Sequence, residues 1–215
     1  MSNTWLEKLN PEFIAKAMNF ALGNTPPNDL AYLLATGKSE LNLRDQLAIH
    51  LNKTLEFGED EFVGREWRKH DLTINRGKSP LALIEGKSYI HYDAANKMHL
   101  ENGKNTIKHD LERDLEKCHH SNKKSKLETK IFFTAILFTV EALNPEDYRH
   151  GDLTYGTYHR QGIRRFGTLP ALRQEGNENL SGLLSRYGTT HHVELSPGHY
   201  RNLAVVADFH VLQVN

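Results

Sequence analysis

The chain has 215 residues, and its 27 basic and 27 acidic side chains leave a formal net charge of zero, which gives no electrostatic argument for a nucleic-acid partner. Hydrophobic residues at 38% and charged residues at 25% fit a globular domain, and the single cysteine, Cys118, excludes an intrachain disulfide. The longest apolar run, Ile131 to Val140, is too short to span a membrane and the first residues do not resemble a signal peptide, so we expect a soluble, cytoplasmic protein without membrane contact.

The first 38 residues predict two helices that form an N-terminal helical extension. Asn10 is a suitable cap, Pro11 fits the first helical position, and Gly23 ends the helix. A second, shorter helix is expected from Asp29 until Gly37. The apolar stripe of the first helix is expected to comprise Phe13, Ala17 and Phe20, with Ile14, Met18 and Leu22 beside it. Residues 1–38 therefore predict packing and no chemistry.

A third helix is predicted from Ser39, as its cap, to about Leu55. Leucines at four-residue spacing define its buried face, namely Leu43, Leu47 and Leu51. Because successive residues of a helix turn by about 100°, Glu40 projects onto that same face. The helix therefore carries a carboxylate at its buried edge, close to its start.

Extended segments follow this helix. Strands are predicted over Trp67–Ile74 and Leu81–Tyr89, an amphipathic helix over Thr106–Cys118, and a strand buried on both faces over Ile131–Val140. A strand, a crossover helix and a second strand predict parallel pairing through a right-handed connection. The order of elements therefore indicates a sheet with helices packed on it.

The region after Pro145 is rich in glycine, tyrosine, histidine and arginine, and we expect loop structure there until a last strand over Leu203–Val214. The predicted fold class is α/β, with a mixed central sheet flanked by helices. Its core is expected to span residues 39–145, and residues 146–215 form a C-terminal part of the same domain, built of loop and strands.

Three charged residues stand where this core can do chemistry. Alternate side chains of a strand share a face, so Glu85 and Lys87 lie together at the end of the apolar run Leu81–Ile84. The preceding strand carries Asp71, and a hairpin turn between the two strands brings both carboxylates together. Two convergent carboxylates suit Mg²⁺ or Mn²⁺, and the Gly86 carbonyl supplies a further oxygen. A neighbouring lysine stabilises the charge that develops on a reacting phosphate.

An acid two residues before a lysine is a common pattern, and chance gives about two in a chain of this composition. Glu128-Thr129-Lys130 is such a rival. It precedes an apolar strand rather than ending one, and no acid stands on a preceding adjacent strand. The context therefore favours Asp71, Glu85 and Lys87, although surface charges in a hairpin remain the simpler alternative for residues of these types.

Together with the order of elements over Ser39 to Val140, these three residues resemble the PD-(D/E)xK superfamily of restriction-endonuclease-like nucleases. The resemblance implies a restriction-endonuclease-like core in which Asp71 and Glu85 bind Mg²⁺. It implies that Lys87 is the catalytic base or an electrostatic stabiliser. Many members add a glutamate from the helix before the strands, and Glu40 matches that position.

The resemblance also implies an activity and partners. The chain would be a Mg²⁺-dependent endonuclease that hydrolyses phosphodiester bonds of DNA, similar to type II restriction enzymes, and family habit implies a homodimer. His70 departs from the pattern, because it stands where the family's name-giving proline would be. Arg160, Arg164 and Arg165, in a segment that interleaves arginine with aromatic residues and glycine, are the candidates for DNA contact. A solvated loop is the alternative for that segment.

Two other functions stay open at this point. One is a nucleic-acid-binding module that has the nuclease fold without catalysis. The other is a different metal-dependent hydrolase that uses the histidines after Gly151, although the chain has no CxxC or HxxxH spacing, so a structural zinc site is not expected. His91, Tyr92 and Asp93 are expected to continue the strand of Glu85, and Asp93 either lines the same cleft as Glu85 or caps the helix that follows it.

Overall fold

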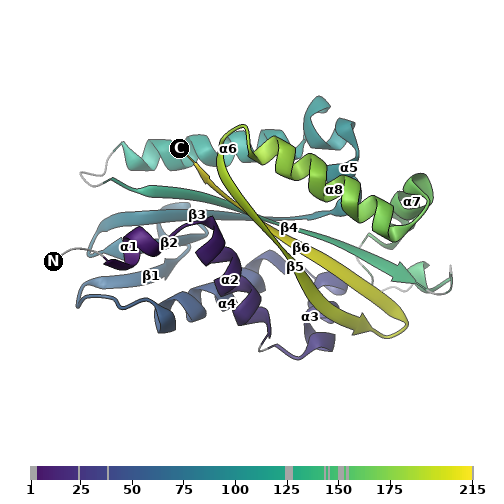
Figure 1. The fold of residues 1–215 in the computed structure, drawn as a ribbon, viewed down its shortest axis with the longest axis horizontal. Coiled ribbons are helices and arrows are strands. Elements are labelled where there is room, and N and C mark those ends of the chain that lie inside the picture. Colours follow the sequence, from purple (N-terminus) through teal and green to yellow (C-terminus); the bar gives the residue numbers. More distant parts are fainter. Residues whose placement is uncertain are drawn as a thin grey trace.

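The computed structural model describes residues 4–23, 25–37, 39–123, 128–142, 144, 146–149, 153 and 155–214. Its centre is a six-stranded sheet with the strand order β1-β2-β3-β4-β6-β5 (Figure 1). The strands are β1 Glu61–Arg65, β2 Leu72–Arg76, β3 Ser79–Ile90, β4 Lys130–Ala142, β5 Gly188–Tyr200 and β6 Leu203–Val214. Only the β3–β4 pair of this sheet is parallel, so the fold is α/β with a mixed open sheet flanked by helices.

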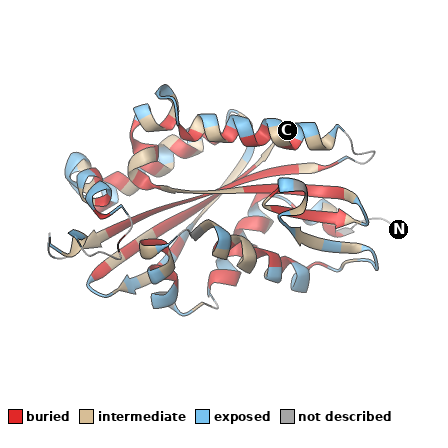
Figure 2. Cartoon of the chain, turned by 180° about the vertical axis from the view of Figure 1, so that it is seen from behind, coloured by how far each residue is buried: buried red, intermediate tan, exposed pale blue. Residues whose placement is uncertain are grey.

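Helices cover both faces of the sheet, with the early helices on one side and the later ones on the other (Figure 1). The first group comprises α1 Thr4–Lys8, α2 Pro11–Gly23, α3 Pro27–Thr36 and α4 Ser39–Thr54. The second group comprises α5 His91–Ala95, α6 Ile107–Asn122, α7 Gly156–Phe166 and α8 Leu169–Leu184. Short helical turns lie at Trp67–Lys69, Met98–Asn102 and Asp147–Arg149. The inner strands of the sheet are largely buried, whereas the edge strands β1 and β5 are mostly intermediate or exposed (Figure 2).

The predicted start of α2 is confirmed, because the helix begins at Pro11 and the Asn10 Oδ1 accepts a hydrogen bond from the Phe13 N–H at 2.8 Å. The predicted apolar stripe is confirmed for Ala17 and for the flanking Ile14, Met18 and Leu22, and it is wrong for Phe20. Phe20 is 62% exposed, whereas Ile14 and Met18 are buried in the core between the helices and the sheet. The buried face is therefore rotated toward the smaller side chains, and the phenylalanines lie at its margin or outside it. The chain before α2 also forms a helix, α1, that the sequence did not indicate.

The parallel β3–β4 pair and its helical crossover are confirmed. The segment between the two strands contains α5 and α6, and Leu83 pairs with Ile131 in the register of the two strands. Strand β4 is buried on both faces from Ile131 to Val140 because helices pack on both sides of it. On the other side of β3, pairing with β2 begins at Leu72 and Ile84. Beyond Ile84, β3 is therefore paired with β4 alone among the described strands, and its other edge is open.

Two segments differ from their prediction near this open edge. Trp67–Ile74 is not one strand, because Trp67–Lys69 form a 3₁₀ turn and β2 starts only at Leu72. Strand β3 does not continue through residues 91–93, since α5 begins at His91. As a result, Asp71 lies just before β2 and Asp93 lies just after β3, both outside the strands.

The prediction for residues 146–215 is wrong in its main feature. Where we expected loop, the structure has α7, α8 and β5, and only β6 matches its predicted range. Helix α8 buries Leu172, Leu180 and Leu183 against the sheet, and its Gly176 packs so closely on the His91 carbonyl that a Cβ would lie 2.9 Å from that oxygen. The C-terminal region therefore completes the sheet and covers one face of it.

Candidate functional site

At the open edge of β3, two backbone N–H groups donate hydrogen bonds to acidic side chains. The N–H of Gly86 donates to the Asp71 Oδ2 at 2.9 Å, and the N–H of Ser88 donates to the Glu40 Oε1, also at 2.9 Å. Asp71 comes from the bend before β2 and Glu40 from the first turn of α4. N–H and C=O of one residue point to the same side of a strand, so the Gly86 carbonyl also faces this edge.

A cleft runs along this edge. The first part, of about 70 Å³, is lined by Glu40, Arg44, Asp71, Gly86, Lys87 and Thr134 together with apolar side chains that include Leu47, Ile84 and Phe209. A larger cleft of about 780 Å³ shares Glu40 with the first and continues past Ser88 toward Asp93, Tyr155 and Tyr158. Of the four predicted site residues, Glu40, Asp71 and Lys87 line the first cleft, and Glu85 is not among its lining residues.

Lys87 reaches from β3 to α6, where its Nζ lies 3.2 Å from the Asp114 Oδ2. Burial disfavours the charged form, but the charges of Asp114, Asp71 and Glu40 outweigh it and raise the pKa of Lys87 above its ordinary value. Lys87 therefore keeps its proton at neutral pH. A protonated amine stabilises negative charge and does not accept a proton, which limits the chemistry available to this residue.

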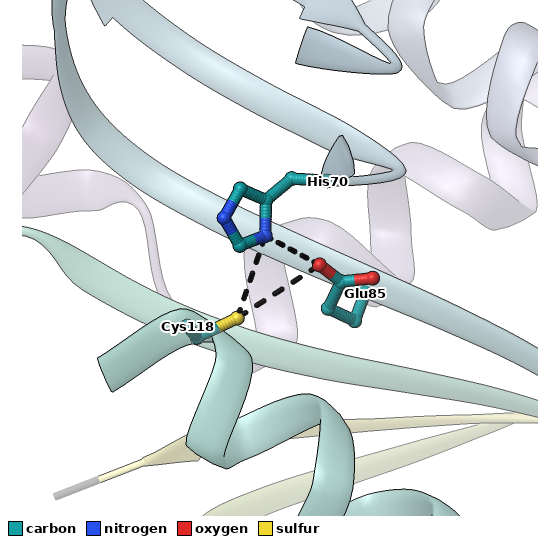
Figure 3. A group of neighbouring side chains, drawn as sticks. All are labelled: His70, Glu85 and Cys118. Atoms are coloured by element: carbon teal, nitrogen blue, oxygen red, sulfur yellow. Dashed lines mark hydrogen bonds and ion pairs between the residues drawn. The ribbon is translucent and has the colours of Figure 1, made fainter. Parts of the chain in front are cut away.

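Glu85 lies apart from that cleft. Its side chain is 2% exposed, and its Oε1 is 2.5 Å from the His70 Nδ1 and 2.8 Å from the Lys117 Nζ. The Cys118 Sγ lies 3.9 Å from the same oxygen. Figure 3 shows the side chains of His70, Glu85 and Cys118 pointing toward one another. The sequence predicted that the carboxylates of Asp71 and Glu85 would meet across adjacent strands. In the structure the Asp71 Oδ2 instead accepts from the Gly86 N–H, and the Glu85 Oε1 contacts His70 and Lys117.

The group of His70, Glu85 and Cys118 was not predicted from the sequence. All three residues are buried, and one ligand atom of each lies within 4.8 Å of the others, so they form a group that could hold a metal ion. The His70 Nε2 is 2.8 Å from the Ser121 Oγ, which fixes the orientation of the ring. Burial, followed by the charge of Glu85, raises the pKa of the Cys118 thiol above its usual range. Without a metal, the thiol therefore stays protonated.

An aromatic and histidine cluster forms the outer end of the cleft. Asp93 lies in the first turn of α5, and its Oδ1 is 2.9 Å from the His99 Nδ1. Burial raises the pKa of Asp93, against the opposing effect of His99. The ring of Tyr158 is stacked near His99, with 6.0 Å between the ring centroids. Asp93 lines the larger cleft, but it does not share that cleft with Glu85, whose side chain contacts His70 and Lys117.

The three arginines predicted to contact DNA lie on α7 rather than in a loop. Arg164 and Arg165 are exposed and Arg160 is half-buried. The Arg165 Nη1 donates to the Tyr92 Oη at 3.0 Å, and its guanidinium lies 5.9 Å from the centre of that ring. Helix α7 thus presents basic groups beside the tyrosines at the outer end of the cleft.

The late histidines take part in a buried network on β5 and β6. Asp208 is fully buried; Arg173 contacts both of its carboxylate oxygens, and His192 lies 2.9 Å from Oδ1. The other oxygen lies 2.8 Å from the His91 Nε2. A carboxylate bound by a guanidinium in this way is satisfied without a metal. The network therefore stabilises the packing of α8 on the sheet.

The rival pattern Glu128-Thr129-Lys130 lies at the other end of β4, away from the cleft. The Lys130 Nζ donates to the carbonyl oxygens of Leu6 and Leu9 at 2.7 Å each. These bonds tie the first helices to the sheet, so Lys130 has a structural role.

Comparison of the chain with protein-family models, with curated proteins and with solved structures finds no match.

Proposed function

We propose that the chain is a metal-dependent endonuclease that hydrolyses phosphodiester bonds of DNA, with a restriction-endonuclease-like core. The observation that carries the proposal is the open edge of β3. There Asp71 and Glu40 bind the N–H groups of Gly86 and Ser88, and Lys87 lines the same cleft. The order α4, β1, β2, β3, α6, β4 around that edge is the second support.

The donor set suits a hard divalent cation. Asp71 offers a carboxylate with one hydrogen bond at the open edge, and the carbonyl of Gly86 faces the same edge. Glu85, which the resemblance implied as the second ligand, is turned away toward His70 and Lys117 and is not part of this donor set. Oxygen ligands of this kind hold Mg²⁺ while leaving places for water and phosphate. When bound, the cation would supply Lewis-acid activation of the phosphate and of a water molecule.

The other residues of the cleft have defined tasks in this proposal. Lys87 remains protonated and stabilises negative charge on the phosphate, so it acts as an electrostatic stabiliser rather than as the base. Glu40, which accepts a hydrogen bond from Ser88, adds its negative charge to that of Asp71 at the proposed cation position and orients water there. Arg160, Arg164 and Arg165 on α7 contact the DNA backbone beyond the cleft. A homodimer would let two such clefts act on the two strands.

One observation favours a second candidate, a DNA-binding module with the same fold and no catalysis. Glu85 already has two basic partners, His70 and Lys117, and Lys87 already has Asp114. Groups whose charges are balanced within the protein have less need of a cation. Binding of a labelled duplex, measured by fluorescence anisotropy, without cleavage under any metal condition would support this candidate.

The decisive experiment compares the wild type with Asp71→Asn. Supercoiled plasmid and single-stranded DNA, modified and unmodified, are incubated with Mg²⁺, Mn²⁺ or EDTA. We expect metal-dependent cleavage by the wild type and none by Asp71→Asn, because the amide keeps the hydrogen bond from Gly86 but loses the charge that holds the cation.

Asp29→Asn is the matched control, since Asp29 is exposed on α3 and is not among the residues that line either cleft. It should cleave like the wild type. Equal cleavage by Asp71→Asn, or no cleavage by the wild type on any of the substrates, would remove the nuclease proposal.

A further inference from the structure

We propose that His70, Glu85 and Cys118 form a binding site for one borderline transition-metal cation, of the kind of Zn²⁺ or Co²⁺. The site is distinct from the Mg²⁺ position proposed at the open edge, because its donors are an imidazole nitrogen, a thiolate and one carboxylate oxygen. Such a set selects zinc-like ions over magnesium, which prefers oxygen ligands.

The geometry of the three donor atoms fits one ion. The Cys118 Sγ lies 3.8 Å from the His70 Nδ1 and 3.9 Å from the Glu85 Oε1, and the last two atoms are 2.5 Å apart. In a tetrahedral site with bonds of about 2.0–2.3 Å, neighbouring donors lie about 3–4 Å apart. Coordination therefore requires the nitrogen and the oxygen to separate by less than the length of one bond, and it leaves the sulfur almost in place.

A second observation supports the site independently of the donors. The His70 ring is held through its other nitrogen, because Nε2 lies 2.8 Å from the Ser121 Oγ. Metal-binding histidines have such an outer partner, which fixes the ring and selects the nitrogen that faces the metal. Here it is Nδ1 that faces Glu85 and Cys118. The three donors come from the segment before β2, from β3 and from α6, so the folded core itself assembles them.

Binding changes the protonation of the group. The contact between the His70 Nδ1 and the Glu85 Oε1 is broken when the metal binds, and Nδ1 coordinates the metal in the tautomer that carries its proton on Nε2, next to the Ser121 Oγ. The Cys118 thiol loses its proton to solvent, and its sulfur becomes the thiolate ligand. Lys117, whose Nζ lies 2.8 Å from the Glu85 Oε1, gives up that contact, and its one-third exposed side chain allows it to turn outward.

The test uses the untagged full chain, stripped with a chelator and then titrated with Co²⁺ and Zn²⁺. We expect one equivalent to bind, and the cobalt form to show a sulfur-to-cobalt charge-transfer band with the intense visible bands of a tetrahedral ion. Cys118 is the only cysteine of the chain, so a charge-transfer band identifies the site without any variant. Native mass spectrometry gives the stoichiometry of zinc.

Variants then separate the ligands from their surroundings. Cys118→Ser should abolish the charge-transfer band and weaken binding at least about tenfold, and Ser121→Ala should weaken it about tenfold. Lys117→Met should strengthen binding because it removes the competing cation. His199→Ala, at an exposed position of β5, is the control and should bind like the wild type.

The result that overturns the proposal is a wild type that takes up no stoichiometric metal, or a cobalt form without a sulfur band. Metal that binds equally to Cys118→Ser has the same consequence. If Cys118→Ser does not fold, the cobalt spectrum of the wild type decides alone. None of these measurements uses DNA cleavage, so this site and the proposed nuclease activity stand or fall separately.

Discussion

Glu40 and Ser88 lie 48 positions apart in the sequence, and the Glu40 Oε1 accepts a hydrogen bond from the Ser88 N–H at 2.9 Å. The bond joins the first turn of α4 to a strand edge that β2 no longer covers. It defines where the helix meets the cleft, and it gives Glu40 two separable properties, a hydrogen-bond acceptor and a negative charge.

Glu40→Gln and Glu40→Ala separate these properties. The amide oxygen of glutamine still accepts the bond from Ser88, so its free energy of unfolding in urea should match that of the wild type. Alanine leaves the N–H without its acceptor and should cost about 1 kcal/mol. Both variants should lower DNA cleavage, because both lack the charge. Glu59→Gln, which changes an exposed acid in the turn before β1, is the control and should change neither quantity. Wild-type cleavage by Glu40→Gln would show that the charge has no role.

Lys87→Met should lower the cleavage rate by about 10²-fold at saturating substrate, the size of effect seen when one electrostatic contact to the transition state is removed. The surrounding carboxylates raise the pKa of Lys87, so Lys87 does not lose its proton near neutral pH. Any acid limb of the pH–rate profile near neutrality should therefore persist in Lys87→Met. The profile of the wild type between pH 6 and 9 therefore tests the assignment. A limb that disappears in Lys87→Met would identify Lys87 as the base.

Glu85→Ala should destabilise the fold more than Glu85→Gln does. Alanine leaves His70 and Lys117 without their acceptor, and a buried group without a partner costs about 1–3 kcal/mol. Glutamine keeps the size of the side chain and one acceptor oxygen. Urea unfolding of both variants measures the difference. Equal stability would mean that Glu85 contributes little to the packing of α6 on β3.

The network around Asp208 should make the protein unstable in acid. Burial lowers the pKa of His210 from 6.5 to about 3, so the unfolded chain binds a proton at His210 in that pH window while the folded chain does not. The contribution of His210 to the free energy of unfolding is therefore fully present above pH 6.5 and is lost as pH decreases toward 3. The pKa of Asp208 is also lowered, despite burial, by His192, His91 and Arg173, which extends the loss to still lower pH.

His210→Gln should flatten this dependence. Urea unfolding between pH 7 and 4 gives the slope for the wild type, for His210→Gln, and for His199→Gln as the exposed control. We expect a smaller slope for His210→Gln alone. The same slope in all three proteins would place the acid sensitivity elsewhere.

Arg164→Gln should weaken DNA binding without selecting among sequences. A lysine or arginine that contacts phosphate releases about one counterion, so the slope of log affinity against log salt should become shallower by about one. Fluorescence anisotropy at several salt concentrations measures it. Lys16→Gln makes the same change of charge on α2 and should leave the slope unchanged. An unaltered slope for Arg164→Gln would place the DNA contact away from α7.

The sequence predicted the elements whose side chains repeat with a clear period. Strand β4 and helix α6 are such cases, and β6 was placed at its observed range. Helix α8 was missed because glycine, asparagine and serine interrupt it, although Leu169, Leu172 and Leu180 follow a helical spacing. The close approach of the His91 carbonyl explains why residue 176 is a glycine. That contact is between distant parts of the chain, so the sequence of the helix does not reveal it.

The candidate site was predictable to a similar degree. Lys87 was singled out by its alternation with Glu85 after an apolar strand, Glu40 by the buried face of its helix, and Asp71 by the expected hairpin with the strand of Glu85. The surroundings of Glu85 were not predictable, since His70 and Cys118 approach it from other elements and no spacing in the chain relates the three. A single cysteine on the apolar face of a helix gives no indication that a histidine lies 3.8 Å away.

The open edge of β3 beyond Ile84 also bears on whether copies of the chain aggregate through strand pairing. A strand with free N–H and C=O groups is a template on which a strand from another molecule can pair, and proteins block such edges with charge. Asp71 and Glu40 occupy the donors of Gly86 and Ser88, so an incoming backbone finds carboxylates in place of partners. Asp71 and Glu40, the acids proposed to attract a cation, therefore also disfavour aggregation through this edge. Replacing both by apolar residues would leave an uncovered β edge beside the cleft.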